Sequence, residues 1–581
     1  MRFSTSGAAV GACACMVACA GVAIAQQDLA SKVDLVFNRY HTVEEIDKAL
    51  MDLAAAYPEV CRVESIGKSL EGRELLVMTI GTSKGGPIED KPAMWIDGAV
   101  HANEVQSAEA VLYTAWYLTK AYGTNKSLTE LVDRCSFHLL PMVNPDSRVA
   151  WLNGPSSPHN HRSNRRPEDQ DRDGQMDEDG PDDLDGDGSV TQMWKQDPQG
   201  RWERDATDPR IFRRVASDKP PGGWTNLGEE GLDNDGDGLI NEDPVGGDDM
   251  NRNWPAGWLP EYVQGGAGPY PFSAPETRAV GAFIEARPNI AAAQSYHNAG
   301  GMILRGPGAG FRESSYPGGD VRVYDQIARV GEQLLPYYRS MVIHKDLYTV
   351  HGGFVNWTAE SLGIFSFTNE LWTPAKYFQR DQANPTEEQQ WLWRDRMAFG
   401  QLFTEYREFE HPVHGKVFIG GMNKWASRNT PTFLLEEECH RNFAFTMYHA
   451  DQTPRLSVLR DSVESLGSGL WAVTIEIGNS QLIPTRSEHA NGKGIGASDL
   501  LMVEPSAEGA RVAAAFRMNG WMDRTPEPIS HEPARVQNGA GVPGRGSVIY
   551  RFIIESKQAG RVKLLYRAEK AADLTQFVDL R

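Results

Sequence analysis

The feature that most constrains the fold is an alternation of short apolar segments with longer amphipathic ones, from about Val33 to Glu410. The apolar segments have the length of buried strands: "ELLVMTIG", "PAMWIDGAV", "SFHLLPMVNP", "NIAAAQSY" and "GIFSFTNEL". The amphipathic segments have helical periodicity: "EVQSAEAVLYTAWYLTKAYG", "VRVYDQIARVGEQLLPYYRSM" and "EEQQWLWRDRMAFGQLFTEYREFE". This alternation predicts an α/β fold, with a mixed twisted sheet flanked by helices on both faces.

The first expected helix has sequence signals for both its start and its end. Thr42 stands where an N-cap belongs, Glu45 follows three residues later, and Pro58 comes after the apolar pattern stops. This spacing predicts a capping box at the start of the helix.

The sequence pattern changes after His411-Pro412. Short runs such as "LWAVTIEIGN" and "GSVIYRFIIES" are separated by Gly, Pro, Asn and Asp. We therefore expect a β-rich region over 412–581, built as one sandwich or two small ones. The expected α/β region covers 30–411, and an Asp/Gly-rich insert interrupts it at 167–247.

The N-terminus has the pattern of an export signal. Arg2 precedes a run of small and apolar residues, and Ala23-Ile24-Ala25 fits a cleavage site after Ala25. We expect residues 1–25 to be removed and the protein to be secreted or periplasmic. Lipid anchoring at Cys19 is a weaker alternative, because Met16 fits that signal poorly. No later stretch is long and apolar enough to predict a transmembrane segment.

Three cysteines follow the expected signal: Cys61, Cys135 and Cys439. They are too few and too widely spaced for a disulfide scaffold. One disulfide and three buried free thiols both remain consistent with the sequence.

The net charge of −20 argues against nucleic acid or an anionic membrane surface as a partner, since both attract basic proteins. Much of the acidity lies in the insert, where the spacing DxDxD occurs three times. Such spacing places carboxylates at positions 1, 3 and 5 of a calcium loop. The candidate ligands are Asp169, Asp171, Asp173, Asp183, Asp185, Asp187, Asp233, Asp235 and Asp237.

These loops differ from ordinary EF-hands. The twelfth position, normally Glu, is Gly180, Trp194 or Pro244, and flanking helices are not indicated. A disordered acidic loop is the alternative interpretation. Three copies of one ligand spacing in an exported protein favour Ca²⁺ binding.

A candidate metal site begins with "HANE", which places His101 three residues before Glu104, between a strand and a helix. Imidazole and carboxylate are suitable zinc ligands, and three protein ligands leave one coordination position open for catalysis. On its own, however, such a pair is more often a polar pair at the start of a helix.

Four further stretches make the pattern specific: "IGKSLEGRELLVMTIG", "GDDMNRNWPAGW", "QSYHNAGGMILRGPG" and "YTVHGGFVNWTAESLGIFSFTNELW". Taken in order with HxxE, they resemble the zinc metallocarboxypeptidase family of the carboxypeptidase A type. The resemblance covers about Val33 to Glu410 without the insert. It implies a carboxypeptidase-like fold, bound Zn²⁺, and peptide or protein C-termini as partners.

The resemblance also implies a role for individual residues. His101, Glu104 and His297 match the zinc ligands, and Glu370 matches the general base. A carboxylate beside the metal can take a proton from water and give it to the leaving amine.

Four more residues match positions that contact the substrate. Arg162 matches the arginine that stabilises the oxyanion, although Arg165 and Arg166 stand close by. Asn251 and Arg252 match the pair that binds the terminal carboxylate, for which a planar guanidinium is well suited. Tyr348 matches the mobile tyrosine that closes over the bound end.

Specificity follows from the pocket positions. Val355 matches the base of the pocket for the terminal side chain, and Gly308, Val350 and Thr368 match other positions in it. All are uncharged, so we expect a preference for apolar or aromatic C-terminal residues.

The sequence departs from the family in two ways. No long inhibitory pro-region fits between Ala25 and the catalytic region, and the acidic insert separates Arg162 from Asn251. Because both residues belong at the rim of the cleft, we expect calcium to fold the insert into a wall there.

The expected function is secreted zinc-dependent removal of single C-terminal residues. The alternatives are a zinc amidohydrolase acting on cell-wall peptides and a non-catalytic peptide-binding protein. Loss of Glu370 or of a zinc ligand would favour the last, but all are present.

Overall fold

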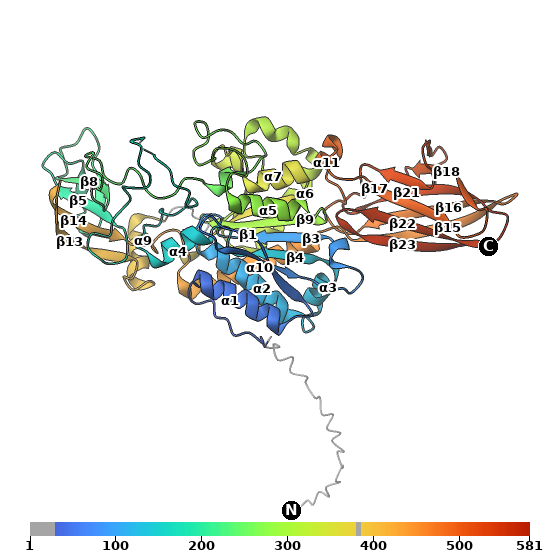
Figure 1. Ribbon diagram of the computed structural model, residues 1–581, viewed down its shortest axis with the longest axis horizontal. Coiled ribbons are helices and arrows are strands. Elements are labelled where there is room, and N and C mark those ends of the chain that lie inside the picture. Colours follow the sequence, from blue (N-terminus) through green and yellow to red (C-terminus); the bar gives the residue numbers. More distant parts are fainter. Residues whose placement is uncertain (1–29, 171, 379–384) are drawn as a thin grey trace, which may run out of the picture.

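The computed structural model describes residues 30–170, 172–378 and 385–581. It has three parts in a row: a sheet formed by the insert at one end, an α/β region in the middle, and a β-sandwich that carries the C-terminus at the other end (Figure 1). The expected signal, 1–25, with Cys19 in it, lies outside the described residues. Within the described chain, no helix has both the length and the apolar character needed to cross a bilayer.

The middle region is built on an eight-stranded sheet of order β1-β2-β4-β3-β9-β12-β10-β11. β3 pairs in parallel with β4 and β9, and β9 with β12, whereas β2 and β10 make antiparallel pairs. The sheet is therefore mixed, as predicted. Its strands are β1 (Cys61–Lys68), β2 (Glu74–Ile80), β3 (Ala93–Asp97), β4 (Ser136–Leu140), β9 (Ile290–Asn298), β10 (Met302–Arg305), β11 (Arg339–Val342) and β12 (Phe365–Leu371).

Helices cover both faces of this sheet. Alternate residues of β2 divide between two apolar cores, Leu76 and Met78 in one and Leu75 and Val77 in the other, because successive strand side chains point to opposite faces. The first core is closed by α1 (Val43–Ala56), α2 (Gln106–Ala121), α3 (Lys126–Arg134), α6 (Gly318–Leu334) and α10 (Thr432–Asp451). The second is closed by α5 (Pro275–Glu285) and α7 (Phe354–Leu362). The predicted fold class is confirmed.

The capping box predicted for α1 is confirmed. Thr42 Oγ1 accepts a hydrogen bond from the Glu45 amide at 3.2 Å, and Glu45 Oε2 accepts one from the Thr42 amide at 2.9 Å.

The insert forms part of a six-stranded sheet of order β13-β14-β5-β8-β6-β7. Its strands are β5 (Gln192–Gln196), β6 (Trp202–Arg204), β7 (Phe212–Arg214), β8 (Trp224–Glu229), β13 (Phe403–His411) and β14 (Gly415–Met422). The sequence analysis expected one helix from Glu387 to Glu410, but only α9 (Glu387–Arg396) is helical and β13 follows it. These residues form a strand because β13 pairs with β14. The Phe403 ring also packs edge-on against Trp391, with the ring centroids 5.2 Å apart.

The region beyond residue 412 also differs from the expectation. β14 belongs to the insert sheet, and α10 packs against α2 and α6 of the middle region. The two-sheet sandwich begins only at Leu456. We therefore propose that the catalytic region runs to about residue 453, with β13 and β14 as a second contribution to the insert.

The sandwich encloses one core shared by two sheets. One sheet has the order β15-β16-β21-β18-β19 and the other β20-β17-β22-β23. Its strands are β15 (Leu456–Gly467), β16 (Leu470–Asn479), β17 (Asp499–Pro505), β18 (Arg511–Met518), β19 (Glu527–Ile529), β20 (Arg535–Asn538), β21 (Gly546–Glu555), β22 (Gly560–Ala568) and β23 (Ala571–Leu580). Three short helices remain: α4 (Pro145–Asn153), α8 (Ala375–Phe378) and α11 (Glu488–Lys493). Cys61, Cys135 and Cys439 are buried free thiols.

Candidate active site

The carboxyl ends of β3 and β9 meet at one edge of the central sheet, because these strands are parallel neighbours. His101 and Glu104 lie in the turn between β3 and α2, where the Glu104 amide donates to the His101 carbonyl at 3.2 Å. His297 is the next-to-last residue of the strand β9. All three side chains are buried.

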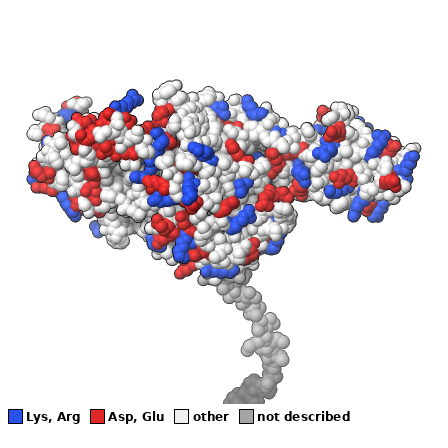
Figure 2. Space-filling view, in the orientation of Figure 1, with Lys and Arg blue, Asp and Glu red and all other residues white. Residues whose placement is uncertain are grey.

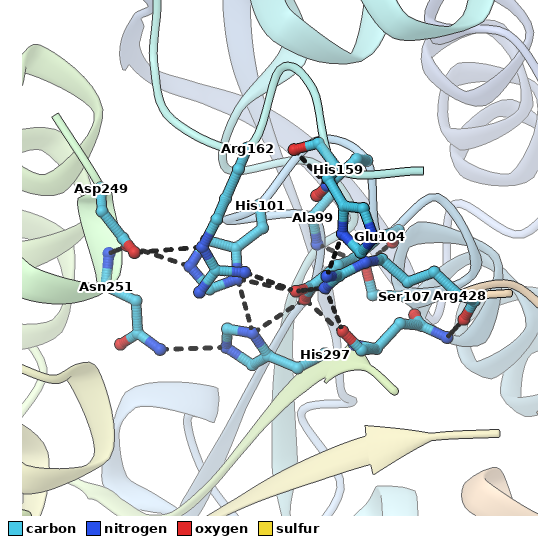
Figure 3. Close-up of polar contacts among 12 residues, drawn as sticks. Ala99, His101, Glu104, Ser107, His159, Arg162, Asp249, Asn251, His297 and Arg428 are labelled. Atoms are coloured by element: carbon cyan, nitrogen blue, oxygen red, sulfur yellow. Dashed lines mark hydrogen bonds and ion pairs between the residues drawn. The ribbon is translucent and has the colours of Figure 1, made fainter. Parts of the chain in front are cut away.

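These three side chains form a compact cluster (Figure 3). Glu104 lies 3.0 Å from the Nδ1 atoms of both His101 and His297, through different carboxylate oxygens, and the two Nδ1 atoms are 3.1 Å apart. Ligands 2.0–2.2 Å from a tetrahedral zinc ion are separated from one another by roughly 3.3 Å. The spacing therefore fits a small divalent cation bound by two imidazoles and one carboxylate.

The other nitrogen of each imidazole also has a partner. His101 Nε2 lies 2.9 Å from Asp249 Oδ1, and His297 Nε2 lies 3.4 Å from Asn251 Nδ2. A carboxylate at Nε2 keeps the proton there, which leaves the Nδ1 lone pair of His101 free for a metal. Burial alone would raise the pKa of Asp249, but the charges of Arg252, His101 and Arg162 hold it well below its usual range.

The pKa of Glu104 is also lowered. Burial opposes ionisation of this carboxyl group, but the two imidazoles beside it outweigh that effect. Glu104 therefore stays anionic throughout the neutral range.

Glu370 reaches the same edge from β12. Strand pairing sets Glu370 directly beside His297 in the parallel β9–β12 ladder. Desolvation raises the pKa of Glu370 to about 7, and the nearby Glu104 carboxylate acts in the same direction. A carboxyl group tuned to this range can both accept and return a proton near neutral pH.

A cleft of about 610 Å³ opens over the cluster. Arg162, Arg252, Tyr348 and Glu370 all line it. Arg162 donates to Glu104 Oε1 at 3.0 Å and to Asp249 Oδ2 at 3.2 Å. Of the three candidate arginines, only Arg162 lies here, since Arg165 pairs with Glu71 and Arg166 with Asp248.

The remaining expected substrate residues lie in and beside the cleft. Arg252 donates to the Asn251 carbonyl at 2.9 Å, and Asn251 Oδ1 accepts the Phe354 amide at 3.0 Å. Tyr348 lines the cleft and is 58% exposed. Val355 is instead buried in an apolar cluster with Val350, and neither residue is among those that line the cleft.

Two residues of the site escaped the sequence analysis. Asp249 could have been found, because it stands two residues before Asn251 in the same short motif. Arg428 gave no signal, because it lies between β14 and α10, far along the chain from the other site residues. Its guanidinium donates to Glu104 Oε1 at 3.2 Å and to the Asn298 carbonyl at 3.0 Å, and it lines the cleft.

The expected calcium loops share a local geometry. In each, the first aspartate accepts a hydrogen bond from the amide of a glycine five residues later: Gly174 to Asp169, Gly188 to Asp183 and Gly238 to Asp233. Asp171 lies outside the described residues. Acidic groupings that could hold a cation occur at Asp173, Asp183, Asp185, Asp233, Asp235 and Asp237, and they also include Glu178, Asp179, Glu230 and Glu242.

A buried cluster of two histidines and a glutamate at the carboxyl edge of a mixed α/β sheet is the kind of centre that zinc hydrolases use. The model of the zinc carboxypeptidase family matches residues 46–393. The chain belongs to this family, and membership implies Zn²⁺ as the metal. A second family, described as a domain of unknown function (DUF8731), matches residues 455–579.

Individual relatives agree with the family match. Carboxypeptidase A2 of Rattus norvegicus is 25% identical over 371 residues, which cover 61% of this chain and 69% of that protein. Carboxypeptidase D of Homo sapiens is 37% identical over 107 residues, 18% of this chain and 8% of that protein. The inactive metallocarboxypeptidase ECM14 of Saccharomyces cerevisiae is 33% identical over 113 residues, 19% of this chain and 26% of that protein. Family membership by itself therefore does not establish catalysis.

Among solved structures, the carboxypeptidase A of Helicoverpa armigera covers 72% of this chain and 74% of its own length, with 19% identity and a TM-score of 0.44.

Proposed function

We propose that this protein is an active zinc carboxypeptidase that hydrolyses the last peptide bond of a chain and prefers apolar or aromatic terminal residues. The observation that carries the proposal is the convergence of His101, Glu104 and His297 beside Glu370, in a cleft that also holds Arg252. Residues suited to bind a metal, to accept a proton and to bind a carboxylate thus meet at one cleft.

The residues present fit the metal. His101, Glu104 and His297 would hold Zn²⁺, because their facing atoms are two imidazole nitrogens and a carboxylate at tetrahedral spacing. When bound, zinc supplies Lewis-acid activation of water and of the scissile carbonyl.

The side chains of the cleft would perform the other parts of the reaction. Arg252 would bind the free carboxylate of the substrate, because its planar fork can make two parallel hydrogen bonds to it. Arg162 would stabilise negative charge that develops on the scissile carbonyl oxygen. Tyr348 would close over the bound terminus.

Glu370 would move the proton. It takes a proton from the attacking water as the new C–O bond forms, and it gives that proton to the amine as the C–N bond breaks. Glu370 is thereby restored to its carboxylate form. Bound Zn²⁺ would oppose the neighbouring carboxylates and favour the ionised form that acts as base.

The expected preference for apolar terminal residues rests on the uncharged residues at the positions that match the family's pocket. Val350 and Val355 belong to an apolar cluster, and Gly308 lies against Asn356 and the Val350 backbone. An ammonium or guanidinium buried among such groups would lack a counter-ion.

The test uses N-blocked dipeptides that vary in the last residue. We expect hydrolysis of those that end in apolar or aromatic residues, loss of activity on zinc removal, and recovery when zinc is added back. Glu370→Gln should lower kcat about 10²–10⁴-fold, whereas Glu508→Gln, an exposed glutamate of the sandwich, should not. Activity that survives zinc removal or the Glu370 substitution would refute the mechanism.

Two further expectations belong to this proposal. We propose that the protein is exported with cleavage after Ala25, which N-terminal sequencing of the mature protein would test. We propose calcium ions in the insert on separate grounds, from its enclosed carboxylate oxygens that accept no hydrogen bond from the described residues.

A further inference from the structure

The first and third acidic loops of the insert, 169–179 and 233–243, are in direct contact. An isolated antiparallel bridge joins Asp179 to Asp243, with a hydrogen bond from the Asp243 amide to the Asp179 carbonyl at 3.1 Å. The Asp243 carboxylate accepts hydrogen bonds from the amides of Gln170 and Asp177 in the first loop. Two loops that are 64 residues apart in sequence are therefore one structural unit.

Several carboxylates in this unit are enclosed without a hydrogen-bond donor. Asp179 has no exposed surface, and its Oδ2 accepts no hydrogen bond from the described residues. Glu178 and Glu242 are partly exposed residues, but both carboxylate oxygens of each are enclosed and accept no hydrogen bond from the described residues. A buried anionic oxygen that has lost its water must be compensated by a donor, a proton or a cation.

The positions of these oxygens favour a cation. Ligand atoms of Asp179, Asp233 and Asp235 all lie within 4.8 Å of one another. Two oxygens bound to one calcium ion at 2.3–2.6 Å can be separated by at most roughly 5 Å. Asp179 comes from the first loop and the other two from the third, so one ion can bind both loops.

Asp235 is shared by further groupings of the same size. They are Asp173 with Glu178 and Asp235, and Asp235 with Asp237 and Glu242. Without a cation, ionised carboxylates this close would repel one another and drive the loops apart.

The identity of the cation follows from the donor atoms. All side-chain donors in these groupings are carboxylate oxygens, without the histidine or cysteine that zinc prefers. Their irregular arrangement on flexible Asp/Gly loops suits Ca²⁺, which takes six to eight oxygens, better than Mg²⁺, which demands a near-ideal octahedron.

The middle loop differs. Its Asp183 and Asp185 group with the buried Glu230, but both Glu230 oxygens already accept hydrogen bonds from Thr191 and Leu184. We therefore infer bound ions only at the first and third loops.

The paired loops stand next to the active site. A cavity of about 550 Å³ is lined on one side by Gly180, Asn241 and Pro244 and on the other by His159 and Arg162. His159 and Arg162 also line the cleft over the metal cluster, so the two cavities share a wall. The acidic side chains of the insert gather at this end of the molecule (Figure 2).

We propose that Ca²⁺ bound by Asp179, Asp233 and Asp235, with Asp173, Glu178, Asp237 and Glu242 beside them, joins the two loops and so forms the outer wall of a cavity that receives the upstream part of longer peptides. The part about peptides rests on the proposed function, whereas the part about calcium is independent of it.

The first experiment tests the ions on the full-length zinc protein. The protein is freed of calcium by dialysis over a chelating resin in zinc-containing buffer and then titrated with CaCl₂ in a calorimeter. In parallel, limited proteolysis follows cutting between residues 167 and 247. We expect saturable binding below about 1 mM and cutting at least about tenfold slower with calcium than without it.

Variants and ions provide the controls. Asp235→Asn removes the shared ligand and Asp179→Asn the buried one, and each should abolish the calcium-dependent protection. Asp218→Asn, an exposed aspartate of the insert outside the groupings, should keep it. Absence of calcium binding by the unaltered protein, or equal protection by MgCl₂ at the same concentration, would overturn the calcium assignment.

The second experiment compares two substrates. Removal of calcium should raise KM for a hexapeptide by about tenfold or more and leave kcat/KM for an N-blocked dipeptide within about twofold. The dipeptide reports on the zinc centre, so inactivity towards both substrates with calcium present would refute the peptidase function and not the calcium sites. Calcium binding with no effect on the hexapeptide KM would overturn the role of the insert in peptide binding.

Discussion

At the scale of single residues, Asp249 determines which nitrogen His101 presents to the cluster. Its carboxylate lies 2.9 Å from His101 Nε2 and also accepts from Arg162. Without it, neutral His101 could carry its proton on Nδ1, where it would compete with a metal.

We therefore expect Asp249→Asn to weaken zinc binding about 10–100-fold. Competition with a chelator of known affinity measures the change, and circular dichroism checks that the fold is intact. Arg165→Gln, which removes an arginine that pairs outside the cleft, serves as the control. An unchanged zinc affinity would show that Asp249 does not orient His101.

A substitution at Arg252 can separate the effect of its positive charge from the effect of its planar guanidinium. Arg252→Lys keeps the positive charge but loses the planar fork, so kcat/KM for dipeptides should fall by about 10²-fold, the loss of roughly one strong bidentate contact. The fall should come mainly from KM if Arg252 binds the substrate and its transition state equally.

The matched substrate is a dipeptide with an amidated C-terminus. This substrate lacks the carboxylate, so its slow turnover should be nearly the same for Arg252→Lys and for the unaltered enzyme. If the substitution impaired the two substrates equally, Arg252 would act on the fold or the metal and not on the terminal carboxylate.

At the scale of elements, parallel pairing explains why distant motifs meet. β3, β9 and β12 are successive parallel neighbours, so the ends that carry His101, His297 and Glu370 reach the same edge of the sheet. Short apolar runs in the sequence were sufficient to predict these strands. They were not sufficient to predict β13, whose charged residues suit an exposed helix equally well and whose partner β14 decides the outcome.

The helix α10 carries a histidine that makes the stability of the folded protein depend on pH. His449 on this helix is fully buried against the Phe367 ring, and burial lowers its pKa from 6.5 to about 3. The folded state therefore stays unprotonated where the unfolded state takes up a proton. The stabilisation is complete above pH 6.5 and is lost as the pH falls from 6.5 towards 3.

His449→Leu should reduce the pH dependence of the unfolding free energy by about 1.4 kcal/mol per pH unit between pH 6 and 4. Urea denaturation of the zinc-free protein at several pH values measures this slope. The exposed His531→Leu should leave the slope as it was. An identical slope for His449→Leu and the unaltered protein would mean that His449 is protonated in the folded state.

At the scale of the whole molecule, the sandwich is held to the catalytic region by buried polar contacts. The Asp320 carboxylate, at the start of α6, accepts the amides of Glu488 and His489 at 2.8 and 2.9 Å and so caps α11. Lys570, beside β23, donates to the Ile290 carbonyl at 2.7 Å. These contacts join the two folded parts into one body.

Asp320→Ala would leave two amides of α11 without an acceptor, at a cost of about 1–3 kcal/mol. We expect the sandwich and the catalytic region to unfold in separate transitions in this variant, as followed by differential scanning calorimetry. Asp325→Ala, on the same helix and exposed, should keep the unaltered profile. A single unchanged transition in Asp320→Ala would show that this contact does not couple the two regions.

The sequence by itself determined the class of fold, and it predicted most of the residues that the structure brings together at the edge of the central sheet. Strand-length apolar runs fix the strands because burial on both faces requires them, and HxxE, Asn-Arg and Glu370 stand out because each chemistry requires a particular residue type. Only the tertiary structure decided which of Arg162, Arg165 and Arg166 enters the cleft and that Arg428 joins it. It also decided that the first and third acidic loops pair across the insert. These outcomes depend on contacts between segments far apart in the chain, which local patterns of charge and hydrophobicity do not encode.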